Sequence, residues 1–153
     1  MKKIKVYIAS DHAGYEMKIK LIKAFKKKYD FVDLGCNSAK SCDYPKYAFA
    51  LSKKVVATHT PGILVCGSGF GMSIAANKVK GIACTVITKP EMAHLAKEHN
   101  NCNVIALSGK WVPLKDNIKI ISNFLNAKFD PTDQKNQRLV TRLQMITDYD
   151  KHR

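Results

Sequence analysis

A cysteine followed by a glycine-rich segment is the feature of this sequence best suited to chemistry. Residues 62–66 read Gly-Ile-Leu-Val-Cys, and residues 67–73 read Gly-Ser-Gly-Phe-Gly-Met-Ser. The apolar run predicts a buried strand, and the glycines predict a tight loop that leads into a helix. Such a loop directs backbone N–H groups outward and favours anions. We therefore expect the thiol of Cys66 beside an anion-stabilising loop at the end of a strand, where open α/β sheets place ligands.

The spacing within this segment excludes several familiar sites. The glycines follow G-x-G-x-G, whereas a dinucleotide fingerprint is G-x-G-x-x-G and a P-loop ends in G-K-[ST]. Met72 stands where a phosphatase of the C-x5-R type carries arginine. A cysteine can act as a nucleophile or as a general base. The local sequence leaves both roles open, together with plain packing of a small residue at a strand end.

Polar residues also follow the first apolar run, which predicts a strand over residues 4–9. Asp11 and His12 come directly after it, and the carboxyl ends of parallel strands form the ligand side of an open sheet. Asp11 could equally cap a helix that begins near Tyr15, and the two roles are compatible.

Two further residues stand at predicted helix ends. Tyr44 precedes a proline and combines an aromatic hydroxyl with a signal that is typical of a plain helix start. His99 ends a predicted helix over residues 90–98, where the helix dipole favours a histidine whatever its role. We expect His12, Cys66 and His99 to lie near one edge of the sheet.

The chain of 153 residues predicts one domain, and its 46% hydrophobic content is typical of a protein with a real core. No apolar run is long enough for a transmembrane helix, and the N-terminal apolar run is too short for a signal peptide. The five cysteines are odd in number and include no C-x-x-C pair, which favours neither a disulfide framework nor a zinc site. We expect a cytoplasmic protein.

The net charge of +14 raises the question of nucleic acid. The lysines are spread through ordinary predicted elements, with no basic tail, zinc finger or aromatic–basic RNA motif. This pattern favours solvated helix faces over a nucleic-acid groove. The positive field would also steer an anionic metabolite toward the protein.

Alternating apolar patterns predict a parallel sheet with helices on both faces. The expected strands cover residues 4–9, 31–34, 63–66, 82–88 and 103–107, and the expected helices cover residues 15–28, 45–57, 71–78, 90–98, 114–126 and 132–149. Asp130 precedes a proline, which separates the last helix, and Thr132 or Asp133 can cap it. We expect this detached helix to pack on a partner subunit.

The last predicted helix carries two stripes. The basic stripe comprises Lys135, Arg138 and Arg142, and the apolar face beside it comprises Leu139, Leu143 and Ile146. The basic stripe could bind phosphate or could simply be solvated, and the pattern alone leaves both open.

Five stretches in order resemble the type B ribose-5-phosphate isomerase family, which includes the bacterial galactose-6-phosphate isomerase subunits. They are residues 9–14, 43–45, 66–78, 97–100 and 103–106. The resemblance implies one Rossmann-like α/β/α sandwich domain over residues 1–153. It also implies a homodimer or tetramer with active sites at the subunit interface, and neither a metal nor an organic cofactor. The implied partner is a small sugar phosphate, with neither nucleic acid nor membrane.

The implied reaction is the interconversion of ribose 5-phosphate and ribulose 5-phosphate in the pentose phosphate pathway. By this resemblance Cys66 is the general base that moves a proton between carbon 2 and carbon 1, and Ser68 assists proton traffic. His99 opens the sugar ring with help from Asp11 and Tyr44.

The implied binding groups surround this catalytic set. N–H groups of Gly67, Gly69 and Gly71 stabilise an enediolate. Asn77 and Asn100 hold substrate hydroxyls or the enediolate oxygen. The phosphate is expected to contact His12, Lys110, Lys135 and Arg138.

The phosphate-binding residues depart from the family pattern. Lys110 stands where an arginine is usual, and Gln134 stands one turn before Arg138, with Lys135 adjacent. Lysine lacks the bidentate fork of arginine, so an isomerase of allose or galactose 6-phosphate is an alternative. His99 and Asp43 are generally absent from the galactose-6-phosphate subunits, which favours the ribose enzyme. A nucleotide- or nucleic-acid-binding α/β module is the remaining alternative.

Overall fold

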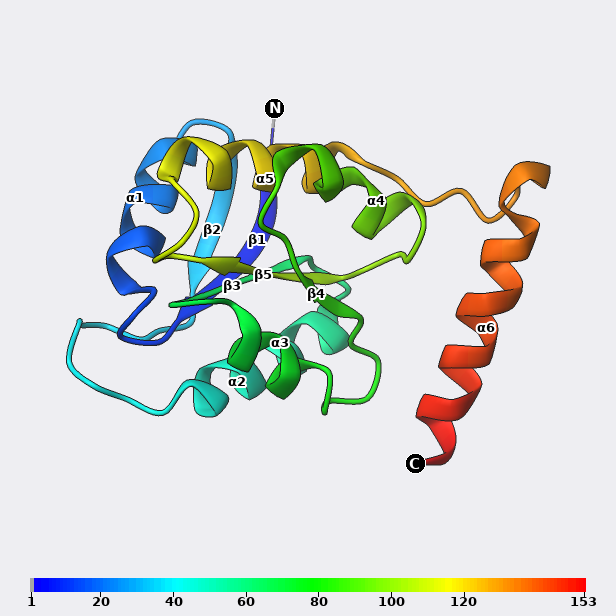
Figure 1. The fold of residues 1–153 in the computed structure, drawn as a ribbon, viewed down its shortest axis with the longest axis horizontal. Helices are drawn as coiled ribbons and strands as arrows, with labels where there is room; N and C mark the ends of the chain where they lie inside the picture. The colour runs from blue at the N-terminus through cyan, green and yellow to red at the C-terminus, as the bar shows by residue number, and fades with distance from the viewer. Residues whose placement is uncertain (1) are drawn as a thin grey trace.

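Five parallel strands form the centre of the molecule in the computed structural model, which describes residues 2–153 (Figure 1). In chain order they are β1 (Ile4–Ser10), β2 (Tyr29–Asp33), β3 (Gly62–Cys66), β4 (Cys84–Val86) and β5 (Val104–Ser108). The strands lie in the order β2-β1-β3-β5-β4, and every neighbouring pair is parallel. The predicted α/β fold with a parallel sheet is therefore confirmed.

Helices cover both faces of this sheet. They are α1 (Tyr15–Phe25), α2 (Tyr44–Thr58), α3 (Phe70–Ala76), α4 (Ala93–Glu98), α5 (Leu114–Asn126) and α6 (Gln137–His152), with short 3-10 turns at Pro90–Met92 and Gln134–Asn136. In Figure 1, α1, α4 and α5 lie above the sheet, and α2 and α3 lie below it. The three layers follow from repeated strand–helix units, because each crossover carries its helix back over the sheet.

Alternation along the strands divides the core in two. In β3, Ile63 and Val65 pack with α1 and α5, whereas Leu64 and Cys66 pack with α2 and α3. Every residue of β3 and β5 is buried. A strand with both faces covered is apolar throughout, which explains the continuous runs in the sequence.

Several predicted boundaries shift by a few residues. The first helix ends at Phe25, earlier than expected, and the strand expected over residues 82–88 is paired only at Cys84–Val86. The last helix begins at Gln137, after a 3-10 turn in which the Asp133 side chain accepts the Lys135 N–H at 2.9 Å. Local capping thus begins near the predicted residue, but regular α-helical geometry starts one turn later.

The α6 helix stands apart from the body in Figure 1, and none of its residues is buried. Its Asp150 accepts the Gly81 N–H at 2.7 Å, and Arg153 donates to the Asn77 carbonyl at 3.0 Å. Large apolar side chains on it, Met145, Ile146 and Tyr149, are more than 60% exposed. Across the described residues, no helix combines the length and apolar character needed to cross a membrane.

Gly14 lets the start of α1 close on the end of β3. A Cβ at this position would lie 2.2 Å from the Val65 carbonyl oxygen and 2.9 Å from the Cys66 nitrogen. Its φ of −96° is open to any residue, so the requirement for glycine comes from this close approach. The contact fixes the Asp11–His12 turn against the strand that ends in Cys66.

We expect Gly14→Ala to lower the free energy of unfolding by about 1–3 kcal/mol, because the added methyl group meets rigid backbone. Chemical denaturation measures this change. Gly67→Ala is the matched control, since its Cβ would meet only the Ala13 methyl at 3.6 Å. A Gly14→Ala protein as stable as the wild type would contradict the close approach.

Candidate active site

Cys66 is the last residue of β3, and a tight loop folds back over its sulfur. The thiol is 5% exposed, and the Gly69 N–H donates to Sγ at 3.0 Å. Gly69 has a φ of +87°, and a Cβ there would lie 3.3 Å from the Leu107 carbonyl oxygen. Glycine is therefore needed for the loop to reach the thiol. The Gly69 N–H thus points at the sulfur atom and fixes the position of the loop relative to it.

The loop also presents free backbone donors. The N–H groups of Gly67, Ser68 and Gly71 make no hydrogen bond within residues 2–153, and all three residues are half-buried. The Phe70 N–H, in contrast, donates to the Ser68 hydroxyl at 3.2 Å. The expectation that the Gly69 N–H binds the enediolate is therefore corrected, because the Cys66 sulfur accepts it at 3.0 Å. The N–H groups of this loop that the described residues leave free are those of Gly67, Ser68 and Gly71.

The Asp11–His12 turn lies beside this loop. Asp11 is buried, and its carboxylate accepts the Gly14 N–H at 2.9 Å, so it organises the entry to α1. The Nδ1 atom of His12 accepts the Cys42 N–H at 3.3 Å, which leaves the Nε2–H of His12 as a donor for a ligand.

Tyr44 packs against the same glycine loop from the start of α2. A Cβ on Gly71 would lie 2.8 Å from Cζ of the Tyr44 ring. Tyr44 is 38% exposed, so part of this residue is accessible beside the loop. The glycine at 71 is what permits this approach.

Lys110 reaches the site from the turn after β5. Its N–H donates to the Gly67 carbonyl at 3.1 Å, and its ammonium lies 5.4 Å from the centre of the Trp111 ring. Ser108 supports this turn: its hydroxyl donates to the Gly67 carbonyl at 2.7 Å and accepts the Trp111 N–H at 2.9 Å. The sequence pattern did not single out Ser108, although a polar residue that ends an apolar strand is the signal that could have.

His99 lies at the opposite edge of the sheet, so the expectation that it would approach Cys66 is wrong within one chain. It directly follows α4 and precedes β5, whose first residue, Val104, pairs with Gly62. Cys66 pairs with Ser108 at the other end of the same two strands. Four residue steps separate the two edges, which is about 13 Å along β3. The α4 helix returns the chain to the amino edge, as Figure 1 shows.

Asn77 and Asn100 also lie at this amino edge. The Asn77 side chain exchanges two hydrogen bonds of 2.8 Å with the backbone of Cys84, so its amide is occupied. Both asparagines line a cavity of about 530 Å³, together with Leu143 and Ile146 of α6. This cavity lies between the β4 edge and α6.

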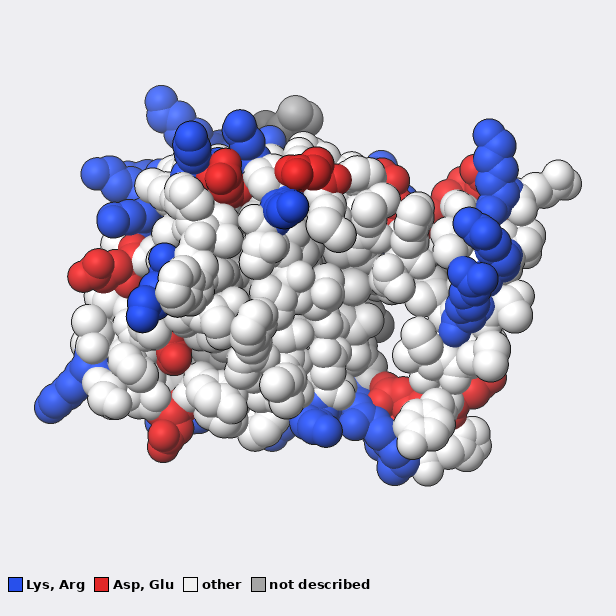
Figure 2. All heavy atoms as spheres, in the orientation of Figure 1, with Lys and Arg blue, Asp and Glu red and all other residues white. Residues whose placement is uncertain are grey.

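The basic residues of the last helix are remote from Cys66 as well. Lys135 and Arg138 are exposed, and Figure 2 shows basic side chains gathered along α6, which touches the body at its C-terminal end. The site residues expected from the sequence therefore form two groups. The Cys66 cluster comprises Asp11, His12, Tyr44, Cys66, Gly67, Ser68, Gly69, Gly71 and Lys110, and the distal group comprises Asn77, His99, Asn100, Lys135 and Arg138.

The thiols differ in chemical character. Burial raises the pKa of Cys84 to about 12 and that of Cys102 to about 11. All five cysteines are free. Within residues 2–153, no three His, Cys, Asp or Glu side chains are grouped so as to hold a metal ion.

Comparisons with known proteins identify the family of this chain. A model of the family described as Ribose/Galactose Isomerase matches residues 6–143. The chain belongs to this family. A probable ribose-5-phosphate isomerase B of Mycoplasma pneumoniae is 42% identical over 128 residues, covering 82% of this chain and 84% of the relative. The ribose-5-phosphate isomerase B of Mycobacterium tuberculosis is 32% identical and covers 99% of this chain and 93% of its own.

Solved structures show the same ribose/galactose isomerase fold. Ribose-5-phosphate isomerase B of Clostridium thermocellum has a TM-score of 0.90 and 36% identity, over 97% of this chain and 99% of its own. The enzyme of Mycoplasma genitalium, solved with bound ribulose-5-phosphate, has a TM-score of 0.88 and 38% identity over the full length of both chains. The Rossmann-like architecture implied by the sequence is thereby confirmed.

We expect Cys84 and Cys102 to resist alkylation by iodoacetamide at pH 8 in the folded protein. Their raised pKa values leave almost no thiolate, which is the nucleophile. Peptide mass spectrometry after a timed reaction measures this, and protein unfolded in urea, where all five cysteines react, is the control. Alkylation of Cys84 or Cys102 as fast in the folded as in the unfolded protein would contradict their burial.

Proposed function

We propose that the protein interconverts ribose 5-phosphate and ribulose 5-phosphate, with Cys66 as the general base. The observation that carries this proposal is the Cys66 thiol, which accepts the Gly69 N–H and lies beside three free N–H donors. The family assignment and the names of the relatives support the same substrate. An aldose–ketose isomerisation needs one base and a pocket for an oxyanion, and these groups supply both.

The proposed proton path begins at the thiolate. Cys66 Sγ takes the proton from carbon 2 of the open-chain aldose and returns it to carbon 1. The negative charge that develops on the substrate oxygens is stabilised by the N–H groups of Gly67, Ser68 and Gly71. We assign to the Ser68 hydroxyl the transfer of the proton that leaves oxygen 2 and reaches oxygen 1. No atom is gained or lost, as an isomerisation requires.

We further propose that each active site combines two copies of the chain. Ring opening and much of the phosphate binding are assigned to the distal group, His99, Lys135 and Arg138, which one chain holds away from Cys66. A second copy whose distal group faces the Cys66 cluster of the first would complete the site. The exposed apolar residues of α6 support this, because a helix without buried residues gains its stability from packing.

In such a homodimer, His12 and Lys110 would hold the phosphate from one copy, and Lys135 and Arg138 from the other. The Nε2–H of His12 is free for this role. The side chains of His12 and Lys110 each offer an anion single hydrogen bonds, whereas the planar guanidinium of Arg138 can bind it bidentately. The five free cysteines support the cytoplasm as the compartment of this enzyme, since thiols remain reduced there.

We expect Cys66→Ala to lower kcat for ribose 5-phosphate by roughly 10²–10⁴-fold, because general-base catalysis contributes that much. Steady-state kinetics on ribose 5-phosphate and on allose 6-phosphate measure the change. Cys102→Ala is the matched control, because it removes a second buried thiol, which lies at the amino edge and away from Cys66. It should leave kcat within a few-fold of wild type.

Two outcomes would contradict the proposal. If Cys66→Ala keeps the activity of the Cys102→Ala control, Cys66 is not the base. If the wild-type enzyme prefers allose 6-phosphate by kcat/KM, the substrate is a hexose phosphate.

A further inference from the structure

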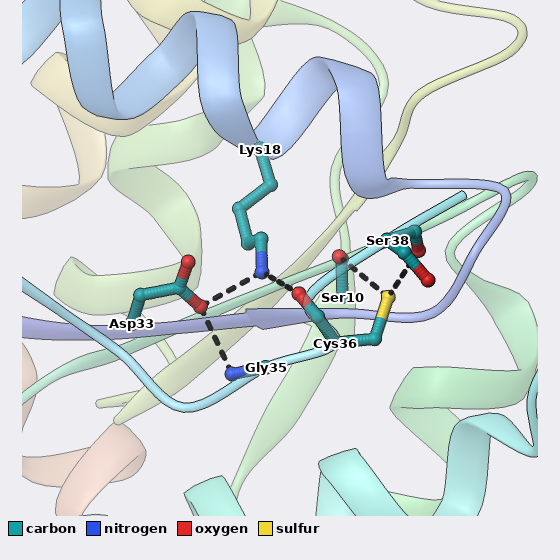
Figure 3. Close-up of polar contacts among 6 residues, drawn as sticks. All are labelled: Ser10, Lys18, Asp33, Gly35, Cys36 and Ser38. Carbon is teal, nitrogen blue, oxygen red and sulfur yellow. Dashed lines mark hydrogen bonds and ion pairs between the residues drawn. The ribbon is translucent and has the colours of Figure 1, made fainter. Parts of the chain in front are cut away.

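One buried ammonium group plays no part in the proposed mechanism. Lys18 of α1 has no exposed surface, and its Nζ donates to Asp33 Oδ1 at 2.8 Å and to the Cys36 carbonyl oxygen at 2.5 Å (Figure 3). Lysine is almost never fully buried without partners, since desolvating its charge is costly. An apolar side chain could fill the same volume without that cost, which directs attention to the groups that this ammonium holds.

Lys18 secures the turn that follows β2. Asp33 Oδ1, which accepts from Lys18, also accepts the Gly35 N–H at 2.9 Å. The Cys36 carbonyl is held from the other side by the same ammonium group. One charged pair thus fixes the path of residues 33–36.

This turn is joined to the end of β1. The Ser10 N–H donates to the Gly35 carbonyl at 2.6 Å, and the Cys36 N–H donates to the Ser10 carbonyl at 2.8 Å. The Cys36 sulfur also lies 3.7 Å from the Ser10 hydroxyl, as Figure 3 shows. Because Ser10 directly precedes the Asp11–His12 turn, the position of Cys36 helps to fix the position of that turn.

A second connection runs through the loop of residues 37–43. Residues 37–41 are exposed, and the loop is anchored at its two ends. At one end the Cys36 thiol donates to the Ser38 carbonyl at 3.2 Å, and at the other the Cys42 N–H donates to His12 Nδ1 at 3.3 Å. The loop therefore links the carbonyl that Lys18 holds to the imidazole ring of His12.

We propose that Lys18 is a positioning residue for phosphate binding: it fixes the Cys36 end of this loop, and the Cys42 end then sets the tautomer and orientation of His12. The proposal rests on the proposed function to the extent that His12 binds the substrate phosphate. Lys18 itself contacts neither the thiol nor the N–H donors of the glycine loop, so it acts on binding and not on the base.

Lys18→Met and Lys18→Arg test this proposal, with Leu21→Ala as the matched control. Leu21 lies on the same helix and is fully buried, so its truncation weakens the packing of α1 without touching the network. The NMR signals of the His12 ring nitrogens report the tautomer, and titration with inorganic phosphate reports binding. Kinetics on ribose 5-phosphate separate KM from kcat.

For Lys18→Met we expect the phosphate affinity to fall and KM to rise about tenfold, the worth of one hydrogen bond to a charged group, with kcat little changed. The His12 ring should lose its single tautomer, and Lys18→Arg should restore part of each effect. The Leu21→Ala control should lower the melting temperature but leave His12 and KM unchanged. If Lys18→Met fails to fold, Asp33→Asn should show smaller changes in the same direction.

The proposal is overturned if a folded Lys18→Met protein, or Asp33→Asn in its place, leaves the His12 signals and phosphate affinity at the level of the Leu21→Ala control. These two measurements do not require turnover. A wild-type protein that fails to isomerise ribose 5-phosphate would therefore overturn the proposed function, while the tautomer of His12 would still decide the role of Lys18.

Discussion

Parallel pairing between β3 and β5 is the constraint on which the rest of the site depends. The register sets Cys66 beside Ser108 at the carboxyl edge and Gly62 beside Val104 at the amino edge. His99 directly follows α4, which leads into β5 through residues 100–103, so it lies at the edge opposite to the thiol. The α6 helix lies beyond that same edge, beside β4. A single chain thus holds half of the proposed reaction machinery at each edge of its sheet, and the proposed symmetric dimer would bring unlike halves together.

Close backbone contacts organise the Cys66 cluster. Gly14 closes on β3, Gly69 turns the loop back over the sulfur, and Gly71 admits the Tyr44 ring. The Ser108 hydroxyl and the Lys110 N–H both donate to the Gly67 carbonyl, which orients the loop from the β5 side. These contacts leave N–H groups free next to Cys66, and the electrostatics of the proposed chemistry follow from that arrangement. The ion pair between buried Lys18 and partly exposed Asp33 fixes the turn that joins the end of β1 at this same edge.

The sequence was sufficient for the sheet, the helices and the placement of Asp11, His12 and Cys66 at one edge, because these depend on local patterns. Lys110 was singled out only by the family resemblance. Alternating apolar runs specify strands and helices, and polar residues placed directly after strands must share the carboxyl edge. The prediction went wrong for His99, although the information was there: in a parallel sheet the helix that precedes a strand runs back to the amino ends of the strands. A residue at the end of that helix must therefore lie opposite to Cys66. The Asn77–Cys84 hydrogen bonds and the Lys18 network join residues from different elements, which a single sequence does not reveal.

Complementation between two inactive variants tests the composite site most directly. We mix equal amounts of Cys66→Ala and His99→Ala chains, allow subunits to exchange, and measure turnover of ribose 5-phosphate. If Cys66 and His99 of different copies share a site, half the dimers regain one intact site, and activity returns to about a quarter of wild type. Mixing Cys66→Ala with His12→Ala, two changes within the Cys66 cluster, should restore no activity. Equal and negligible activity in both mixtures, with exchange verified by mass, would contradict the account.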